Sequence, residues 1–417
     1  MRIGYACLTK GIPYTDFKGV TSKKATPERL NEVTGHNLNT LGNILMYNAE
    51  DGLNMFRLSS DLIPFGSSPV NGTKWWEVFK PQFQELGGLM RDNDMRISMH
   101  PGQYTVLNSP DRDVVNRAID DLIYHNLVLD SLQLDGRAKI IIHIGGVYGD
   151  KNSAIKRFKE AFHRLPEGVK RRLIIENDER LYNIEEVLEI GTTLKIPVVF
   201  DNLHHQVKVG DGKDHMWIRE AAKTWKEEDG IQKIHYSQQD PRKNLGAHSE
   251  TIDVGQLLEY IEENIHHDLD IMLEVKDKNL SAKKAINAVI KTGKIENLEG
   301  EWSRYKYNVL ERSPEGYQRI RGLLKDKDSY PVEEFYSLVD EAMYRTSPTQ
   351  GTVVNGIQHV WGYFKDVATE REKNRFRSEL DRFREGRLSL QAVKKSLWRL
   401  NEKYRDPYLM RSYYFHI

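Results

Sequence analysis

Eight histidines and carboxylates stand at or just beyond the ends of short apolar segments. Glu176 ends the run LIIE, Asp201 ends PVVFD and Glu274 ends IMLE. A charged side chain is costly to bury without a partner, so carboxylates in such places indicate a bound cation or a network of donors. Five histidines occupy similar places. The full set is His100, His143, Glu176, Asp201, His204, His235, His248 and Glu274.

This combination of side chains is typical of a metal site. Imidazole and carboxylate together suit Zn²⁺, Mn²⁺ or iron, and no thiolate competes, because Cys7 is the only cysteine and lies in an apolar run. Eight ligands are too many for one ion and suit two or three. Such a cluster can hold a phosphate, activate water and stabilise the leaving oxygen of an in-line displacement. A single histidine in a strand is usually structural, so the prediction depends on the whole set.

Eight apolar, β-branched segments must position these side chains. The expected strands are Arg2–Cys7, Met55–Ser60, Arg96–His100, Lys139–Ile144, Arg172–Glu176, Pro197–Asp201, Gln232–His235 and Asp270–Val275. Their nearly continuous apolar character suits parallel strands that are covered on both faces. Segments of helical period separate them, and eight such alternations in about 290 residues predict a (β/α)8 barrel. Active sites of that fold lie at the C-terminal strand ends. An open doubly wound sheet is the alternative, but the first strand–helix turn lacks its glycine fingerprint.

The last part of the chain has a different character. Strand-like runs stop near residue 300, and helical patterns rich in aromatic and basic residues follow, among them 356–367, 370–384 and 390–404. Residues 301–417 carry an excess of about five positive charges. We therefore expect a barrel domain over residues 1–297 and a separate all-α domain over residues 301–417.

Composition limits the possible classes of protein. The formal net charge of the 417 residues is zero, so a nucleic-acid partner cannot be argued from global charge. A single cysteine excludes an intramolecular disulfide and favours a reducing, cytoplasmic location. No apolar stretch approaches the ~20 residues that span a bilayer, and the first residues are too polar for a signal peptide. We expect no association with membranes.

The motifs around these side chains resemble those of the UV damage endonuclease family, which is related to endonuclease IV. They include FRLSSDLIPF, SMHPGQY, IENDERLYNIEEVL, PVVFDNLHH and KIHYSQQDPRKNLGAH, and the resemblance covers roughly residues 1–295. It implies a DNA repair endonuclease that cuts the backbone 5′ to pyrimidine dimers and (6-4) photoproducts, leaving a 3′-hydroxyl and a 5′-phosphate. The implied partner is double-stranded DNA with UV lesions, and we expect a monomer. The alternatives are an apurinic/apyrimidinic endonuclease of the endonuclease IV type, a metal-dependent sugar isomerase or epimerase, and a non-catalytic damage binder.

The resemblance also distributes the ligands among three divalent ions. His100, His143 and Glu176 are implied at the first ion, and Glu176, Asp201, His235 and Glu274 at the second; His204 and His248 help to hold the third. Mn²⁺ is preferred, and Zn²⁺ or Mg²⁺ is also possible. Catalytic roles fall to Glu176, Lys233 and His235. The family's lysine at the position of Lys233 can be carboxylated, although an unmodified phosphate contact is an alternative.

Residues that would meet the lesion follow from the same resemblance. Gln103 and Tyr104 match the pair that probes the duplex, since a ring can take the place of an unstacked base. Tyr5 is a similar candidate, with packing at the barrel mouth as its alternative. Ser68 stands where many members carry a histidine, and Arg57 is a candidate phosphate contact.

The C-terminal motifs KYNVLERSPEGYQ, SPTQGTVVNGIQHVWGYFKD and RDPYLMRSYYF resemble the YbgA-like domain, whose role is not established. The basic, aromatic helices could contact DNA, line a pocket for a small ligand or serve only as a packing unit.

Overall fold

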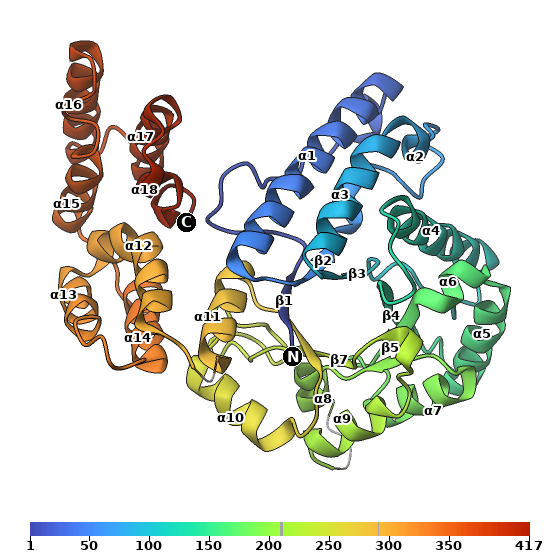
Figure 1. Cartoon of the computed structure of the whole chain (residues 1–417). Helices are drawn as coiled ribbons and strands as arrows, with labels where there is room; N and C mark the ends of the chain where they lie inside the picture. Colours follow the sequence, from blue (N-terminus) through green and yellow to red (C-terminus); the bar gives the residue numbers. More distant parts are fainter. Residues whose placement is uncertain (209–211, 291) are drawn as a thin grey trace. The chain divides into compact units, whose positions relative to one another are not determined.

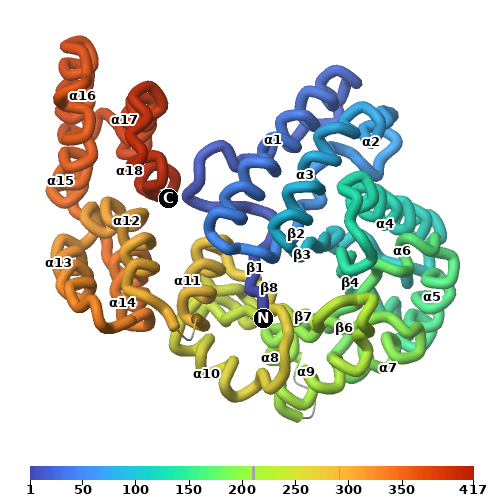
Figure 2. Tube along the Cα trace, viewed as in Figure 1, coloured from blue at the N-terminus to red at the C-terminus, as the bar shows by residue number. Residues whose placement is uncertain are grey.

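The chain forms two compact units. The structure, a computed structural model, describes residues 1–208, 212–290 and 292–417. The first unit comprises Met1–Thr9, Tyr14–Ile252 and Gln256–Lys283, and the second comprises Lys10–Pro13, Asp253–Gly255 and Lys284–Ile417. Figure 1 and Figure 2 trace both units. The chain passes from the first unit to the second between Lys283 and Lys284, within helix α11 (Asn279–Val289). The expected division into a barrel domain over residues 1–297 and a helical domain over residues 301–417 stays a prediction.

The first unit contains the predicted eight-stranded parallel barrel. Its strands are β1 (Ile3–Ala6), β2 (Met55–Leu58), β3 (Arg96–Met99), β4 (Lys139–His143), β5 (Leu173–Glu176), β6 (Val198–Val199), β7 (Lys233–Tyr236) and β8 (Asp270–Leu273). They pair in the order β6-β5-β4-β3-β2-β1-β8-β7. A short seam between β6 and β7 joins the two ends of this order. There Asp201 bridges His235, whose backbone N–H donates to the carbonyl of Phe200 over 2.9 Å.

Parallel register brings the C-terminal strand ends to one rim of the barrel. His143 is the partner of Glu176 between β4 and β5, and Tyr236 is the partner of Leu273 between β7 and β8. Polar side chains that end different strands are therefore neighbours in space, although up to about 170 residues separate them in sequence.

Helices surround the strands, as Figure 1 shows. They are α1 (Pro27–Asp51), α2 (Trp75–Val78), α3 (Lys80–Asp92), α4 (Arg112–Ser131), α5 (Lys151–Arg164), α6 (Glu167–Arg172), α7 (Ile184–Leu194), α8 (Asn202–Val207), α9 (Asp214–Ala222) and α10 (Val254–Asn264). Local sequence fixes their ends. Asn183 and Glu186 form a capping box at the start of α7, and Gly52 ends α1 in the left-handed conformation. In the described part of the chain, no helix has the length and apolar character that crossing a bilayer requires.

The barrel interior is packed closely at Gly4 in β1. A Cβ atom at this position would lie 2.3 Å from the carbonyl oxygen of Met55 in β2, which is backbone and cannot move away cheaply. We expect Gly4→Ala to lower the free energy of unfolding by about 3 kcal/mol. Chemical denaturation would measure this loss against Gly72→Ala, since Gly72 has no atom within 4 Å of an added Cβ. Equal stability of the two variants would contradict the close packing.

The second unit is helical. After α11 it comprises α12 (Ile295–Arg312), α13 (Pro314–Leu323), α14 (Val332–Asp340), α15 (Gln350–Trp361), α16 (Glu370–Arg384), α17 (Leu390–Tyr404) and α18 (Pro407–Met410). The patterns at 370–384 and 390–404 predict α16 and α17 correctly. The helix expected over 356–367 is wrong at both ends: a capping box at Thr349 starts α15 earlier, and the helix ends before Gly362. Gly356 lets α15 approach α12 closely, because an added Cβ would lie 3.2 Å from the Cβ of Glu311.

Candidate metal centre

The strand-end side chains meet at the C-terminal rim of the barrel. His143, Glu176 and His235 are strand residues of β4, β5 and β7, while His100, Asp201 and Glu274 directly follow or closely follow β3, β6 and β8. His204 lies on α8, one turn after Asp201. His248 pairs with Gln239 in the connection between β7 and α10.

Glu176 is the centre of this arrangement. Its side chain is 1% exposed. One oxygen, Oε1, lies 2.8 Å from Nδ1 of His235 and 3.5 Å from Nδ1 of His204, and the other, Oε2, lies 3.4 Å from Nε2 of His100. Two groups of three side chains can bring their ligand atoms within 4.8 Å of one another: His100, His143 and Glu176, and Glu176, Asp201 and His235. Glu176 belongs to both groups, as expected for a bridging carboxylate.

Unpartnered polar atoms test whether these residues suit a cation. Four ligand atoms of the candidate set are buried and have no hydrogen-bond partner in the part of the chain that the structure describes: Nδ1 of His143, Oε2 of Glu176, Oδ2 of Asp201 and Nε2 of His235. Leaving such an atom unsatisfied costs ~1–3 kcal/mol, and more when the group is charged. All four belong to the two groups around Glu176. Divalent cations would satisfy them together, so the donor set fits a metal centre.

The remaining histidines are oriented in a way that leaves a ring nitrogen for a ligand. Nδ1 of His100 lies 3.0 Å from the carbonyl oxygen of Pro101, and Nδ1 of His204 lies 2.8 Å from that of Asn177. Nδ1 of His248 is bonded to the carbonyl oxygen of Glu274. A carbonyl oxygen only accepts, so Nδ1 donates in each pair and Nε2 points elsewhere. Metal-binding histidines usually have such a partner.

The electrostatics of the rim also favour a multivalent cation. Burial disfavours a charge on Glu176, but His235 and His100 outweigh it and hold the pKa of that carboxyl well below its ordinary value. Burial, together with Glu176 and Glu274, raises the pKa of Asp201. The same carboxylates outweigh burial at His204 and raise its pKa to about 9. Several carboxylates thus compete for few positive charges, and a divalent ion would relieve their repulsion.

Comparison with known proteins identifies the family. The UV-endonuclease UvdE family matches residues 2–339 of this chain. The chain belongs to that family. A second family, a protein of unknown function called DUF1722, matches residues 306–417, in agreement with the YbgA-like resemblance of the C-terminal motifs.

Relatives of this UvdE-family chain cover most of its length. A UV DNA damage endonuclease of Clostridium perfringens (strain 13 / Type A) is 38% identical over 385 residues, which is 90% of this chain and 91% of that protein. One from Bacillus thuringiensis subsp. konkukian (strain 97-27) is 34% identical over 274 residues, 65% of this chain and 86% of that protein. The crystal structure of SacUVDE is similar with a TM-score of 0.66 and 36% identity, covering 69% of this chain and 96% of that one. The match to the Clostridium protein necessarily extends into the second unit.

Lys233 lies on the same face of β7 as His235, because side chains two residues apart in a strand point the same way. Its side chain is buried. Burial, together with Arg96 and Arg57, holds the pKa of Lys233 well below its ordinary value. Its carboxylation stays a prediction for this UvdE-family chain.

The lesion-facing candidates fall into two kinds. Gln103 and Tyr104 are exposed in the loop between β3 and α4, and the Tyr104 side chain lies across Gly102, where an added Cβ would be 2.4 Å from the ring. Ser68 is half-buried in a turn, where its N–H donates to Phe65 over 2.9 Å. The DNA roles of these three residues stay predictions.

Tyr5 requires a correction. It is 0% exposed, and its hydroxyl is bonded to Oδ1 of Asn48 over 2.7 Å and to Oγ1 of Thr9 over 2.8 Å. Its ring packs against Phe56. A side chain enclosed in this way cannot contact a lesion in this structure, so Tyr5 is a core residue.

Two residues at the rim have roles that sequence reasoning missed. Arg57 is buried and paired with the carboxylate of Glu274, a contact that the sequence did not indicate, and its role as a phosphate contact stays a prediction. Asn177 is held to the backbone of Asp201 in both directions: Nδ2 donates to the carbonyl over 3.1 Å and Oδ1 accepts from the N–H over 2.9 Å. A polar residue directly after a strand-end ligand was the available signal for Asn177.

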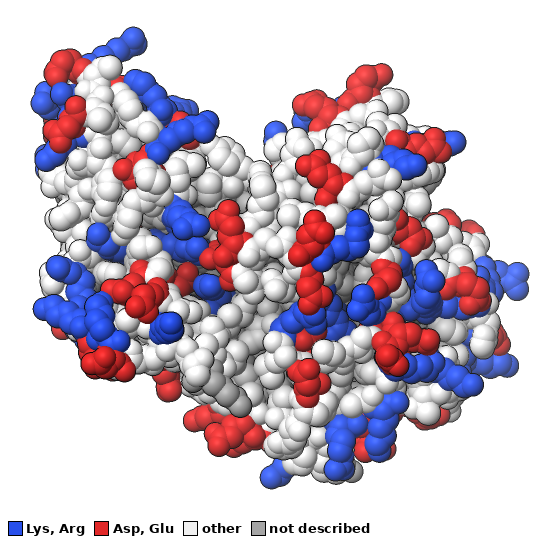
Figure 3. Space-filling model, in the orientation of Figure 1, with Lys and Arg blue, Asp and Glu red and all other residues white. Residues whose placement is uncertain are grey.

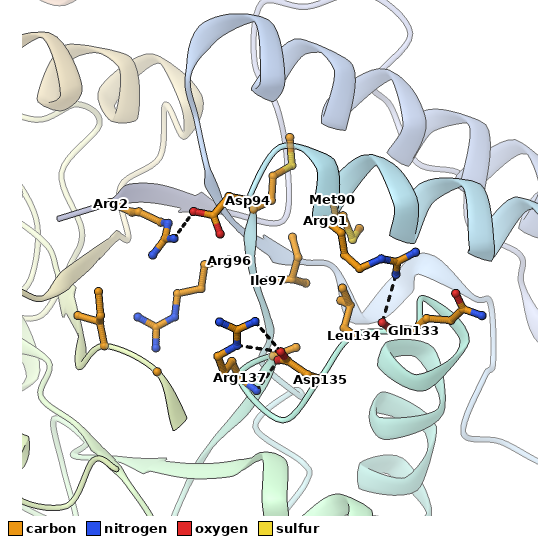
Figure 4. Close-up of a pocket in the computed structure, with 14 residues that line it drawn as sticks. Arg2, Met90, Arg91, Asp94, Arg96, Ile97, Gln133, Leu134, Asp135 and Arg137 are labelled. Atoms are coloured by element: carbon orange, nitrogen blue, oxygen red, sulfur yellow. Dashed lines mark hydrogen bonds and ion pairs between the residues drawn. The ribbon is translucent and has the colours of Figure 1, made fainter. Parts of the chain in front are cut away.

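A pocket of about 520 Å³ lies at the opposite, N-terminal end of the strands (Figure 4). Arg2, Arg96 and Arg137 line it, and Arg2 and Arg137 pair with Asp94 and Asp135. It contains none of the eight candidate ligands. On the face shown in Figure 3, Lys and Arg are interspersed with Asp and Glu, so charge alone does not mark a DNA surface.

Proposed function

We propose that this chain is a UV DNA damage endonuclease that depends on divalent metal ions. It incises DNA immediately 5′ to pyrimidine dimers and (6-4) photoproducts and leaves a 3′-hydroxyl and a 5′-phosphate. Family membership supports the reaction class, and the Clostridium and Bacillus relatives are each named a UV DNA damage endonuclease. The observation that carries the proposal is the set of unpartnered, buried ligand atoms around Glu176.

In this proposal the eight rim residues hold three ions. His100, His143 and Glu176 bind the first, and Glu176, Asp201, His235 and Glu274 bind the second, with His204 and His248 at the third. Mn²⁺ is the first choice because the donors mix nitrogen and oxygen, and Zn²⁺ and Mg²⁺ are the alternatives. Such ions supply Lewis acidity and neutralise the charge of a phosphodiester.

The protein's own side chains supply position and orientation. Glu176 holds the ring of His235, and the backbone carbonyls of Pro101, Asn177 and Glu274 fix the rings of three further histidines. Buried partners of this kind keep ligands in place during the reaction. The exposed pair Gln103 and Tyr104 would enter the duplex at the lesion, where poor stacking makes opening cheaper than in intact DNA.

A nicking assay tests the proposal. With Mn²⁺, we expect the full chain to convert UV-irradiated supercoiled plasmid to open circles, to leave unirradiated plasmid supercoiled and to lose this activity in EDTA. A DNA polymerase should extend the nick directly, because the reaction leaves a 3′-hydroxyl. Cleavage confined to plasmid with abasic sites would favour the endonuclease IV type of activity instead. Turnover of ketoses without nicking would favour a sugar epimerase and reject the proposal.

A further inference from the structure

Four tyrosines converge in the second unit, and we call them the tyrosine cluster: Tyr307, Tyr317, Tyr363 and Tyr408. Their chain positions are α12, α13, the segment after α15, and α18. The hydroxyls of Tyr307 and Tyr363 are 2.7 Å apart, and the rings of Tyr363 and Tyr408 stack at 5.8 Å with 13° between their planes. Tyr317, Tyr363 and Tyr408 are only partly buried, so the cluster reaches the surface of this unit.

Among these rings lies a lysine to which no described residue provides a counter-ion. Nζ of Lys306 is 5.1 Å from the centre of the Tyr307 ring and 5.3 Å from that of Tyr408. Lys306 is half-buried, and it forms no ion pair with any residue that the structure describes. The charged group that acts on it is another cation, Arg321, whose guanidinium lies 5.7 Å from the ring of Tyr317. Burial and Arg321 both lower the pKa of Lys306.

Two lysines of the same unit that are fully buried have carboxylate partners. Lys394 lies 3.1 Å from the carboxylate of Glu311, and Lys284 is paired with Asp340. Pairing is the usual condition for a lysine taken out of water. Among the residues that the structure describes, half-buried Lys306 and exposed Arg321 have no carboxylate partner, and each lies against a phenol ring that attracts a cation. The positive charge at the tyrosine cluster is therefore available to an anion from outside the chain.

We propose that the tyrosine cluster, with Lys306 and Arg321, binds a segment of single-stranded DNA. The phosphates would face the two cations and the phenol hydroxyls, and unstacked bases would lie on the tyrosine rings. Cations beside aromatic rings are the usual way in which proteins hold a single strand without reading its sequence, whereas a duplex hides the faces of its bases. The inference rests on the proposed function, because that function makes DNA the available polyanion. It gives the second unit a role that its family does not supply.

Binding to single-stranded DNA by the full chain tests the inference. The probe is a thymidine oligonucleotide of about 12 nucleotides, measured by fluorescence anisotropy in EDTA. We expect Lys306→Gln and Tyr408→Leu each to weaken binding about tenfold. In Lys306→Gln the slope of log affinity against log salt should fall by about 0.7, the value for one lost phosphate contact on a single strand. The matched control is Lys395→Gln, which replaces an exposed lysine of α17. It should change both the affinity and the salt slope less than Lys306→Gln does.

Location and folding are checked separately. A 5-iodouracil oligonucleotide cross-linked by light should yield peptides that contain Tyr363 or Tyr408. Lys306→Gln should leave the melting temperature close to that of the unmodified chain, because no carboxylate partner among the described residues is lost, and the lost attraction to the phenol rings is offset by relief of the repulsion from Arg321. Unchanged affinity in both variants, or cross-links confined to the first unit, would overturn the inference. The inference would also be overturned if the two variants lost binding to inorganic phosphate or to duplex DNA but bound the single-stranded probe as the unmodified chain does. Nicking of irradiated plasmid by the unmodified chain is scored independently, so failure of the proposed function is recognised by itself.

Discussion

Glu176→Gln is expected to reduce nicking of UV-irradiated DNA by at least about 10³-fold, because several kcal/mol of metal-dependent stabilisation would be lost. Glutamine has nearly the same shape as glutamate, but it carries no charge and its amide nitrogen cannot bind a cation. Glu176 belongs to both candidate ligand groups, so one substitution weakens two ion sites. Initial rates on irradiated plasmid at saturating Mn²⁺ would measure the effect.

The control for this variant is Glu185→Gln. Glu185 is exposed in the first turn of α7, nine residues along the same motif, and it undergoes the same chemical change. Its nicking rate should stay within about twofold of the unmodified chain, as is usual for a surface substitution. Both variants should give the same circular dichroism spectrum. Nicking by Glu176→Gln within tenfold of normal would show that Glu176 is not a shared ligand.

Arg57→Met is expected to lower the free energy of unfolding in EDTA by about 3 kcal/mol and to increase the stabilisation that Mn²⁺ provides. Arg57 is buried against Glu274, whose carboxylate more than offsets burial and raises the pKa of the guanidinium above its ordinary value. Without this cation, Glu274 repels Glu176 and Asp201 more strongly. A divalent ion then relieves a larger repulsion. Denaturant titrations with and without Mn²⁺ would give both quantities.

Arg96→Met provides a matched control. Arg96 is equally buried and lies 2.7 Å from the carboxylate of Asp270, but this pair is at the N-terminal end of the strands. It should lose similar stability in EDTA, and the increment from Mn²⁺ should stay as in the unmodified chain. A smaller Mn²⁺ increment in Arg57→Met than in Arg96→Met would show that Arg57 orients Glu274 for the ion.

The fold was predictable from sequence because parallel strands are buried on both faces. Runs such as KIIIH and LIIE have no amphipathic period, and the polar residue that ends each of these two runs marks the barrel rim. The shortest strand was harder to delimit. Only Val198 and Val199 of the expected Pro197–Asp201 are in β6, since proline has no N–H to donate and the chain turns into α8 after Asp201.

Sequence was a poorer guide to which side chains reach the surface. Tyr5 lies in the first strand, so its position alone was compatible with a lesion contact, but Asn48 of α1 encloses its hydroxyl. Arg57 was a candidate phosphate contact, and its ion pair with Glu274 was not visible in the sequence. Both outcomes depend on contacts between residues more than 40 positions apart. A pattern within one strand cannot reveal such contacts.

The barrel closes at the seam between β6 and β7, which is its shortest strand pairing. Seven of the strand pairings are ladders. The eighth consists of the Asp201–His235 bridge, with the backbone hydrogen bond from the N–H of His235 to the carbonyl of Phe200. Local opening of the barrel is expected first at the pairing with the fewest backbone hydrogen bonds. Both residues of that bridge are candidate ligands, so the proposed ions would also stabilise the strand pairing that positions these two side chains. Metal binding and local opening of the barrel between β6 and β7 would then be coupled, so that each bound ion lowers the population of the open barrel.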